Sequence, residues 1–314
     1  FGQGVLTMTN RNMAMKWFSK RRGMANAVLG TVISFGFSAA PRFLDLLIEN
    51  SGWRGTWRIL ALIIGGGFAL VFLLLARDNP EECGLTPDGI TEGVTQKLSP
   101  LAKLSLRLGL EKHRVQAEPN RDFTLKEAQK TTVFWVYNLA LTLWSMFVTG
   151  FTFHIIDVFS AAGMDRTTAV SIFLPASVIS VSINFFVSWI SDYSRLKHIL
   201  LLYFTGIITS IVSIIFLNDG LWVLLLIIGN GIGGGTFGLL STVVWPRYFG
   251  KSHLGAIAGF SSAWLVGGSA IGPYLFSLMK NLTGSYASAG IITLAAATIL
   301  LILSLKVERP GVRG

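Results

Sequence analysis

The sequence predicts an all-α membrane protein whose helices cross the bilayer several times. Hydrophobic residues make up 52% of its 314 residues and charged residues only 13%, whereas soluble domains carry about 25% charged residues. Apolar runs of about 20 residues, the length that a membrane-spanning helix needs, recur along the chain. The charged residues cluster between these runs, so the net charge of +10 indicates loops at a membrane surface rather than nucleic-acid binding.

We predict eight complete spans and one partial span. The partial span covers residues 1–15, and the complete spans cover 24–48, 57–76, 132–156, 168–190, 198–217, 221–245, 253–279 and 285–305. The polar, proline-containing stretch 77–130 predicts a linker with a short amphipathic helix over 101–113. The expected division is therefore 1–76, the remainder of an N-terminal helical half; 77–130, the linker; 131–306, a six-helix C-terminal half; and 307–314, a tail.

Basic residues predict the orientation, because lysines and arginines concentrate in cytoplasmic loops. Of the 26 lysines and arginines, 21 fall in one set of alternate loops, which includes the linker and the C-terminal tail. The other set contains only Arg42, Arg54, Arg58, Arg166 and Lys280. We therefore expect residues 77–130 and the C-terminus to be cytoplasmic, in a multi-pass protein of a plasma or bacterial inner membrane.

Two connections between spans have similar sequences. Lys16-Trp17-Phe18-Ser19-Lys20 precedes one span, and Arg247-Tyr248-Phe249-Gly250-Lys251 precedes another. Both read basic, aromatic, Phe, small, Lys. Parallel repeats of this kind occur in transporters built from two related halves.

The stretch from Trp17 to Ala25, Trp-Phe-Ser-Lys-Arg-Arg-Gly-Met-Ala, resembles the fifth-helix signature of the monocarboxylate-transporter-like branch of the major facilitator superfamily, which includes oxalate/formate exchangers. Gly36 occupies the position of a later signature glycine, and Ala27 replaces an earlier one. The stretch 78–89 is similar to the segment after the sixth helix of bacterial relatives. The stretch from Ser188 to Lys197 resembles the loop between helices 8 and 9 in degenerate form.

This resemblance implies a major facilitator fold with a partial N-terminal half, namely the end of helix 4 and helices 5–6, and a complete C-terminal half. It implies secondary active transport of a small organic solute, with a monocarboxylate as one candidate, coupled to a proton or a counter-anion. Transport would proceed by alternating access. A chain truncated in its N-terminal half is expected not to transport alone. Two alternatives stay open: an inactive fragment, and a receptor of the same fold that binds solute without moving it.

Two predicted spans carry a polar face. Asn138, Thr142, Ser145, Thr149 and Thr152 follow one another at spacings of three and four residues, which places them on one side of a helix. Ser177, Ser180, Asn184, Ser188 and Ser191 do the same in the next span. Small polar residues often only let membrane helices pack closely. The alternative is a polar lining for a central cavity, for which Asn138, Thr142, Ser145, Thr149, Ser177, Ser180 and Asn184 are the candidates.

Ionisable residues near the outer ends of spans are further candidates. His154 and Asp157 would be neighbours on one helix and could carry a proton or contact the substrate, or simply lie at the membrane interface. Arg42 and Asp45 predict an interfacial ion pair next to Pro41, which we expect to break the helix.

On the cytoplasmic side, the basic and acidic loop residues are either topology anchors or gate residues that pair in one conformation only. The gate candidates are Lys20, Arg21, Arg22, Asp192 and Arg195. Residues 168–190 and 254–279 contain no Lys or Arg, although related carboxylate carriers use a buried cation there, so the substrate stays open.

The sequence contains no nucleophile–base set, phosphate loop or metal-ligand spacing, and therefore predicts neither an enzyme nor a cofactor. The single cysteine, Cys83, allows no internal disulfide. The glycine-rich run 229–238 lies inside an apolar span and has no lysine after it. It predicts close helix packing instead of phosphate binding.

Overall fold

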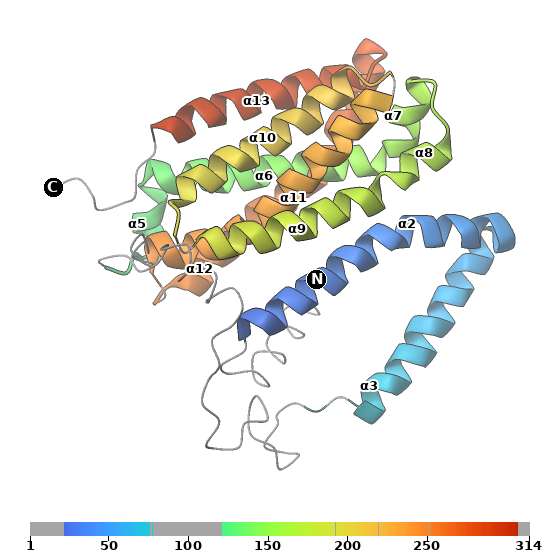
Figure 1. Ribbon diagram of the computed structural model, residues 1–314, viewed down its shortest axis with the longest axis horizontal. Helices are drawn as coiled ribbons and strands as arrows, with labels where there is room; N and C mark the ends of the chain where they lie inside the picture. The colour runs from blue at the N-terminus through green and yellow to red at the C-terminus, as the bar shows by residue number, and fades with distance from the viewer. Residues whose placement is uncertain are drawn as a thin grey trace, which may run out of the picture. The chain divides into compact units, whose positions relative to one another are not determined.

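The computed structural model describes residues 22–75, 77, 121–191, 193–218, 220–250 and 252–306, and for residues 22–29, 34, 37, 38 and 75 it describes the backbone alone. The described elements are all helices (Figure 1). They form two compact units, one up to residue 99 and one from residue 100 on. The predicted partial span 1–15, the helix over 101–113, Cys83 and the tail 307–314 lie outside the described residues.

The first unit is a pair of helical arms joined at a glycine. It comprises α2 (Arg22–Ala61), a π-helical turn, η1 (Leu62–Phe68), and α3 (Ala69–Leu75). Gly52 interrupts α2 with φ 64° and ψ 168°, a conformation that glycine adopts without steric cost. Gly52 thus lies between the predicted spans 24–48 and 57–76. The break expected at Pro41 was wrong, because α2 continues through that residue; membrane helices tolerate proline where other groups satisfy the freed carbonyl.

The ion pair predicted in the first unit is present. Arg42 Nη1 lies 3.8 Å from Asp45 Oδ2, one helical turn further on. The Asp45 side chain is buried whereas the Arg42 side chain is half exposed. The guanidinium therefore keeps its contact with a polar environment while it neutralises the carboxylate.

The second unit contains six membrane-length helical stretches and some shorter pieces. Its elements are α5 (Leu125–Gln129), α6 (Thr132–Phe153), α7 (Ile155–Ala161), α8 (Arg166–Ser171), α9 (Phe173–Ser191), α10 (Leu196–Ile215), α11 (Gly220–Phe249), α12 (Leu254–Thr283) and α13 (Ala287–Leu305). The short helix α8 continues into α9, and together they form one candidate span, Arg166–Ser191.

Among the described residues, seven stretches are long and apolar enough to cross a membrane. Six are those of the second unit, and they match the six spans predicted after residue 131. The seventh, Ala39–Leu74, has 36 residues, or about 54 Å of helix, which exceeds the ~30 Å hydrocarbon core. It turns at Gly52 and therefore contains parts of both spans predicted before residue 76.

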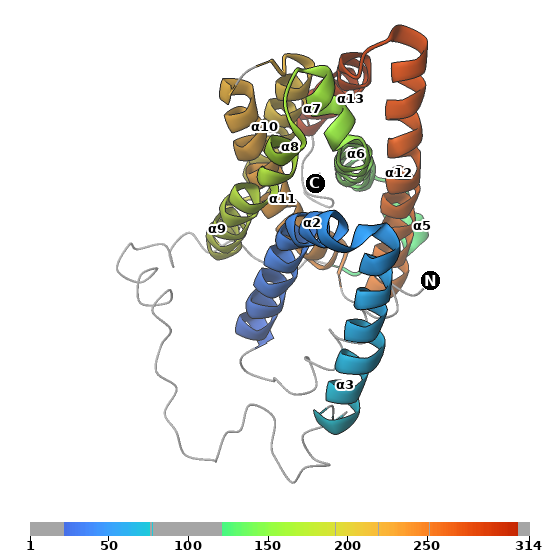
Figure 2. The ribbon, with the colours of Figure 1, turned by 90° about the vertical axis from the view of Figure 1, so that its right-hand side faces the viewer.

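The six spans pack in a pattern with approximate two-fold symmetry. α6 runs along α12, and α11 runs along α9, while α10 packs against both α11 and α13 (Figures 1 and 2). In chain order, α6, α8–α9 and α10 correspond to α11, α12 and α13. Under this correspondence the α6–α12 pair is equivalent to the α11–α9 pair. Since consecutive spans alternate in direction, α6 and α11 are antiparallel. This is the pattern of an inverted repeat.

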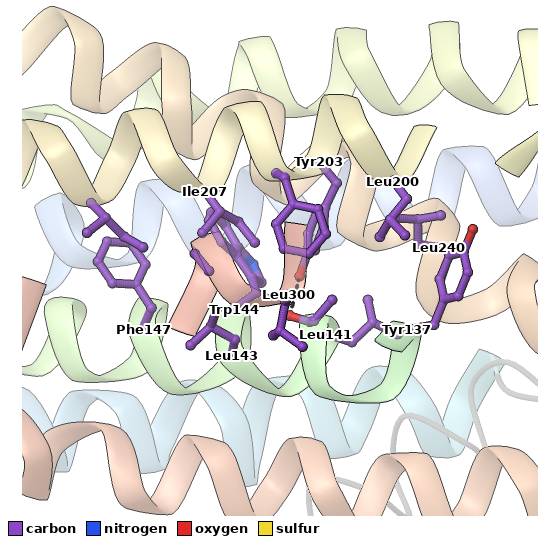
Figure 3. Packing of buried hydrophobic residues seen from close by; sticks show 14 of the residues in the cluster. Tyr137, Leu141, Leu143, Trp144, Phe147, Leu200, Tyr203, Ile207, Leu240 and Leu300 are labelled. Atoms are coloured by element: carbon purple, nitrogen blue, oxygen red, sulfur yellow. Dashed lines mark hydrogen bonds between the residues drawn. The ribbon is translucent and has the colours of Figure 1, made fainter. Parts of the chain in front are cut away.

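Large aromatic side chains fill the centre of the second unit, between α6, α10 and α11. Figure 3 shows Tyr203 of α10 reaching toward α6 among Leu141, Trp144 and Leu240. The Tyr203 hydroxyl donates a hydrogen bond of 3.0 Å to the carbonyl oxygen of Ala140. A fully buried phenol needs such a partner because burial without one costs free energy.

The chain before α6 binds to the turn between α11 and α12. The Phe123 amide donates to the Phe249 carbonyl at 2.8 Å, the two rings meet edge to face at 5.7 Å, and the Ser252 hydroxyl donates to the Asp122 carboxylate. Gly250 has φ +87°, and a Cβ added there would overlap the Asp122 side chain. This position therefore requires glycine for its conformation and for the space beside it.

We predict that Gly250→Ala destabilises the second unit more than Gly284→Ala does. Both glycines have positive φ, which costs a residue with a Cβ about 1–2 kcal/mol. Only at Gly250 does the added methyl group also displace Asp122, since nothing lies within 4 Å of a Cβ at Gly284. Thermal unfolding of both variants in detergent micelles measures the difference, and equal losses would contradict the account of the turn.

Candidate functional site

The polar face of α6 lies against α12. The Ser145 hydroxyl donates to the Leu265 carbonyl at 2.8 Å, and the hydroxyls of Thr149 and Ser269 are 3.0 Å apart. Thr142 donates to the Asn138 carbonyl of its own helix at 2.8 Å. Thr152, the last residue of the stripe, is exposed. Most of the stripe therefore follows one helix–helix interface, which we call the α6–α12 interface.

Glycines bring the two backbones of this interface into contact. A Cβ added to Gly272 would lie 2.1 Å from the Met146 carbonyl oxygen, and one added to Gly150 would lie 2.8 Å from the Gly272 carbonyl oxygen. A Cβ at Gly268 would meet Thr142 at 2.8 Å. No larger residue fits at these positions, so hydroxyls on α6 can reach backbone carbonyls of α12.

Asn138 is the exception within the stripe. Its side chain is 0% exposed, and neither its amide nitrogen nor its amide oxygen hydrogen-bonds to a protein group. Leaving such a group unsatisfied costs about 1–3 kcal/mol for each buried donor or acceptor. Asn138 therefore does not contribute to stability through hydrogen bonds of its side chain.

The polar face of α9 lies against the glycine-rich run of α11. The Asn184 amide donates to the Gly235 carbonyl at 2.9 Å, and a Cβ at Gly234 would meet the Ser180 hydroxyl at 3.1 Å. Ser177 is buried and donates to the Leu174 carbonyl of its own helix at 2.8 Å. The glycine run thus has the packing function predicted for it.

At the opposite end of α6 from Asn138, the helix ends at Phe153, and His154 separates it from α7. His154 Nε2 donates to the Pro273 carbonyl of α12 at 3.1 Å, and its ring stacks on Phe276 with centroids 6.4 Å apart. Asp157 is exposed, and in the described part of the chain no ion pair joins it to His154. The structure therefore brings His154 to α12.

Tyr286, just before α13, completes this group. Its ring lies 5.6 Å from that of His154, and the Lys280 ammonium lies 5.2 Å from its centroid. Burial raises the pKa of the Tyr286 hydroxyl, and the nearby Asp157 carboxylate adds to this effect. The phenol therefore stays neutral at physiological pH.

The end of the unit near residue 191 contains a buried arginine that the sequence analysis did not single out. Arg247 is 6% exposed, and its Nη1 donates to the Ser191 carbonyl, the last of α9, at 2.7 Å. The neighbouring Tyr248 places its hydroxyl 3.4 Å from that of Tyr137 on α6. The repeated basic–aromatic–Phe sequence was the signal that could have identified both residues.

The gate candidates are only partly described. Arg195 is exposed at the start of α10. Arg22 begins α2, and only its backbone is described, while Lys20, Arg21 and Asp192 lie outside the described residues. In the part of the chain that the structure describes, no group of three or more His, Cys, Asp or Glu side chains could hold a metal ion.

Comparison with known proteins identifies the group of proteins to which these helices belong. The sequence model described as Major Facilitator Superfamily matches residues 1–273. No curated protein sequence matches the chain.

We predict that Asn138→Leu raises the stability of the second unit, whereas Asn184→Leu lowers it. Leucine removes two unsatisfied buried groups at residue 138, each of which costs about 1–3 kcal/mol. At residue 184 leucine removes the hydrogen bond to the Gly235 carbonyl. Thermal unfolding of both variants in the same detergent distinguishes them, and a loss of stability in Asn138→Leu would show that this amide has a partner.

Proposed function

The chain belongs to the Major Facilitator Superfamily, a family of membrane transporters, and from this premise we propose that it carries a small organic solute by secondary active transport. Asn138 is the observation that carries the proposal. A buried polar group that costs stability, in a bundle that crosses a membrane, is typical of a functional site. The resemblance of the stretch from Trp17 to Ala25 to monocarboxylate carriers makes monocarboxylates the first substrates to test.

We propose that the polar faces of α6 and α9 line the path of the solute in one of the alternating states. The α6 residues are Asn138, Thr142, Ser145 and Thr149, and the α9 residues are Ser177, Ser180 and Asn184. In the described state these side chains lie in helix interfaces. A shift of α12 along α6, or of α11 along α9, would expose them, and the symmetry of the two pairs supports a movement of both.

His154 and Asp157 are the proposed sites of coupling to a proton. His154 supports this role because it joins the α6–α7 break to α12, so a change in its charge would alter an interhelical contact. Histidine is also the side chain that most readily changes charge between pH 5 and 8.

We propose that the cytoplasmic gate is formed by Lys20, Arg21 and Arg22 in one half and by Asp192 and Arg195 in the other. The hydrogen bond between Arg247 and the Ser191 carbonyl supports this, because it fixes the end of α9 next to Asp192. We propose likewise that residues 77–130 and the C-terminus are cytoplasmic, which the distribution of basic residues supports.

We predict that the complete gene product in proteoliposomes performs counterflow, in which unlabelled pyruvate inside drives the uptake of radiolabelled pyruvate. The variant Asn138→Leu should insert normally and lose at least about tenfold in rate, equivalent to ~1.4 kcal/mol. Leu139→Ala, a change at the next residue, serves as the control. Binding of pyruvate without counterflow would identify a receptor instead, and normal counterflow in Asn138→Leu would remove Asn138 from the site.

We predict that His154→Gln flattens the pH dependence of uptake between pH 5 and 8, since glutamine can still donate a hydrogen bond to Pro273 but cannot change its charge. His198→Gln, at an exposed position on α10, controls for a general effect of losing a histidine. A pH profile unchanged by His154→Gln would leave His154 with a structural role alone.

A further inference from the structure

Lys126 of α5 and Lys130, the residue that follows α5, carry charge that no described group neutralises. Lys126 and Lys130 are one helical turn apart and exposed, and among the described residues neither ammonium forms an ion pair. The two nearby carboxylates are already occupied. Glu127 accepts from the Thr124 amide at 2.8 Å and lies 3.5 Å from Arg121, and Asp122 accepts from Ser252.

Aromatic rings lie next to these lysines. The Trp135 indole donates to the Gln129 carbonyl, next to Lys130, at 2.7 Å. The same indole meets Trp264 of α12 edge to face at 5.6 Å and Phe260 at 6.2 Å. Trp264 is 39% exposed. Tryptophan prefers the level of the lipid headgroups, where its ring lies in an apolar layer and its N–H meets polar groups.

An apolar face of α6 continues from this corner. Trp135, Leu139, Met146 and Phe153 are spaced by four, seven and seven residues, so they share one side of the helix. Phe153 is 74% exposed. Phe153, at the far end of this side, suits contact with acyl chains. Near its start this side adjoins the polar stripe, since Trp135, Asn138 and Thr142 are spaced by three and four residues.

Glu127 is charged at neutral pH. Hydrogen bonds from the Thr124 backbone and hydroxyl lower the pKa of Glu127, and its carboxylate lies 3.5 Å from Arg121. That pairing leaves Lys126 and Lys130 as the cations free to bind an anion from outside the protein.

We propose that Lys126 and Lys130, together with Trp135 and Trp264, bind the headgroup of an anionic phospholipid of the surrounding bilayer. The lysines contact the phosphate, the indoles lie at the glycerol level, and the acyl chains follow the apolar face of α6. A basic side chain near an anionic membrane surface typically contributes about a fivefold gain in affinity. Lys126 and Lys130 lie before α6, outside the polar faces that we propose to line the solute path.

The test is native mass spectrometry of the complete protein titrated with dioleoyl-phosphatidylglycerol. Lys126→Gln and Lys130→Gln should each weaken binding roughly fivefold, whereas Lys126→Arg with Lys130→Arg should retain it. Raising the ionic strength should weaken binding to the parent protein, because salt screens exposed charges. Arg195→Gln, which removes one charge at another loop, is the matched control and should bind normally. Thermal unfolding confirms that each variant is folded.

Three results would overturn the proposal. The first is unchanged phosphatidylglycerol binding when both lysines are glutamine. The second is an equal loss in Arg195→Gln, which would indicate a response to net charge alone. The third is equally tight binding of phosphatidylcholine, or full competition by inorganic phosphate, which would exclude a site for an anionic bilayer lipid.

Discussion

The direct contact of helix backbones at glycine is the interaction on which the second unit depends. In a bilayer, helices gain little from hiding apolar surface, because lipid chains are as apolar as leucine. Association must come from close packing and from hydrogen bonds between helices. Gly272 allows close packing, because its backbone contacts the Met146 carbonyl. Gly235 allows close packing with α9, and its carbonyl also accepts a hydrogen bond from Asn184. A methyl group at either glycine would separate the helices and also lengthen the hydrogen bonds beside it.

The same constraint explains which polar residues are structural. Serine and threonine can donate to a carbonyl of their own helix, as Thr142 and Ser177 do, so burial costs them little. An amide has both a donor and an acceptor to satisfy and has no equally simple solution within a helix. Asn184 finds a partner in α11, whereas Asn138 finds none among protein groups. Two asparagines on equivalent polar faces therefore have different consequences for stability, which composition alone does not reveal.

The sequence predicted the spans well because the thickness of the hydrocarbon layer fixes their length, and it predicted the packing function of the glycine run because no other residue is as small. It predicted which side of each helix is polar but not which helix packs against that side. Periodicity shows that residues share a face, and it does not identify the neighbouring helix. For this reason the sequence could not show that α12 packs against the polar face of α6. His154 contacts α12 at the break between α6 and α7, a contact that helical spacing alone does not reveal. The expected break at Pro41 was wrong because Gly52 provides the turn. Arg247 was missed because a basic residue at the end of a span resembles a topology anchor. The roles assigned to the gate and cavity residues stay predictions.

The long sequence separation between paired helices has a consequence for biogenesis. Ser145 and its acceptor Leu265 are 120 residues apart. At about 5–20 residues per second, the ribosome needs roughly 6–24 s to deliver the second after the first. During that interval α6 resides in the bilayer without the helix that accepts its hydroxyl groups, and Ser145 can only donate back to its own backbone. The interval between the synthesis of α9 and that of α11 is shorter, because only one span lies between them. The α9–α11 pair can therefore assemble first, and α6 can pack against this pair before α12 is synthesised.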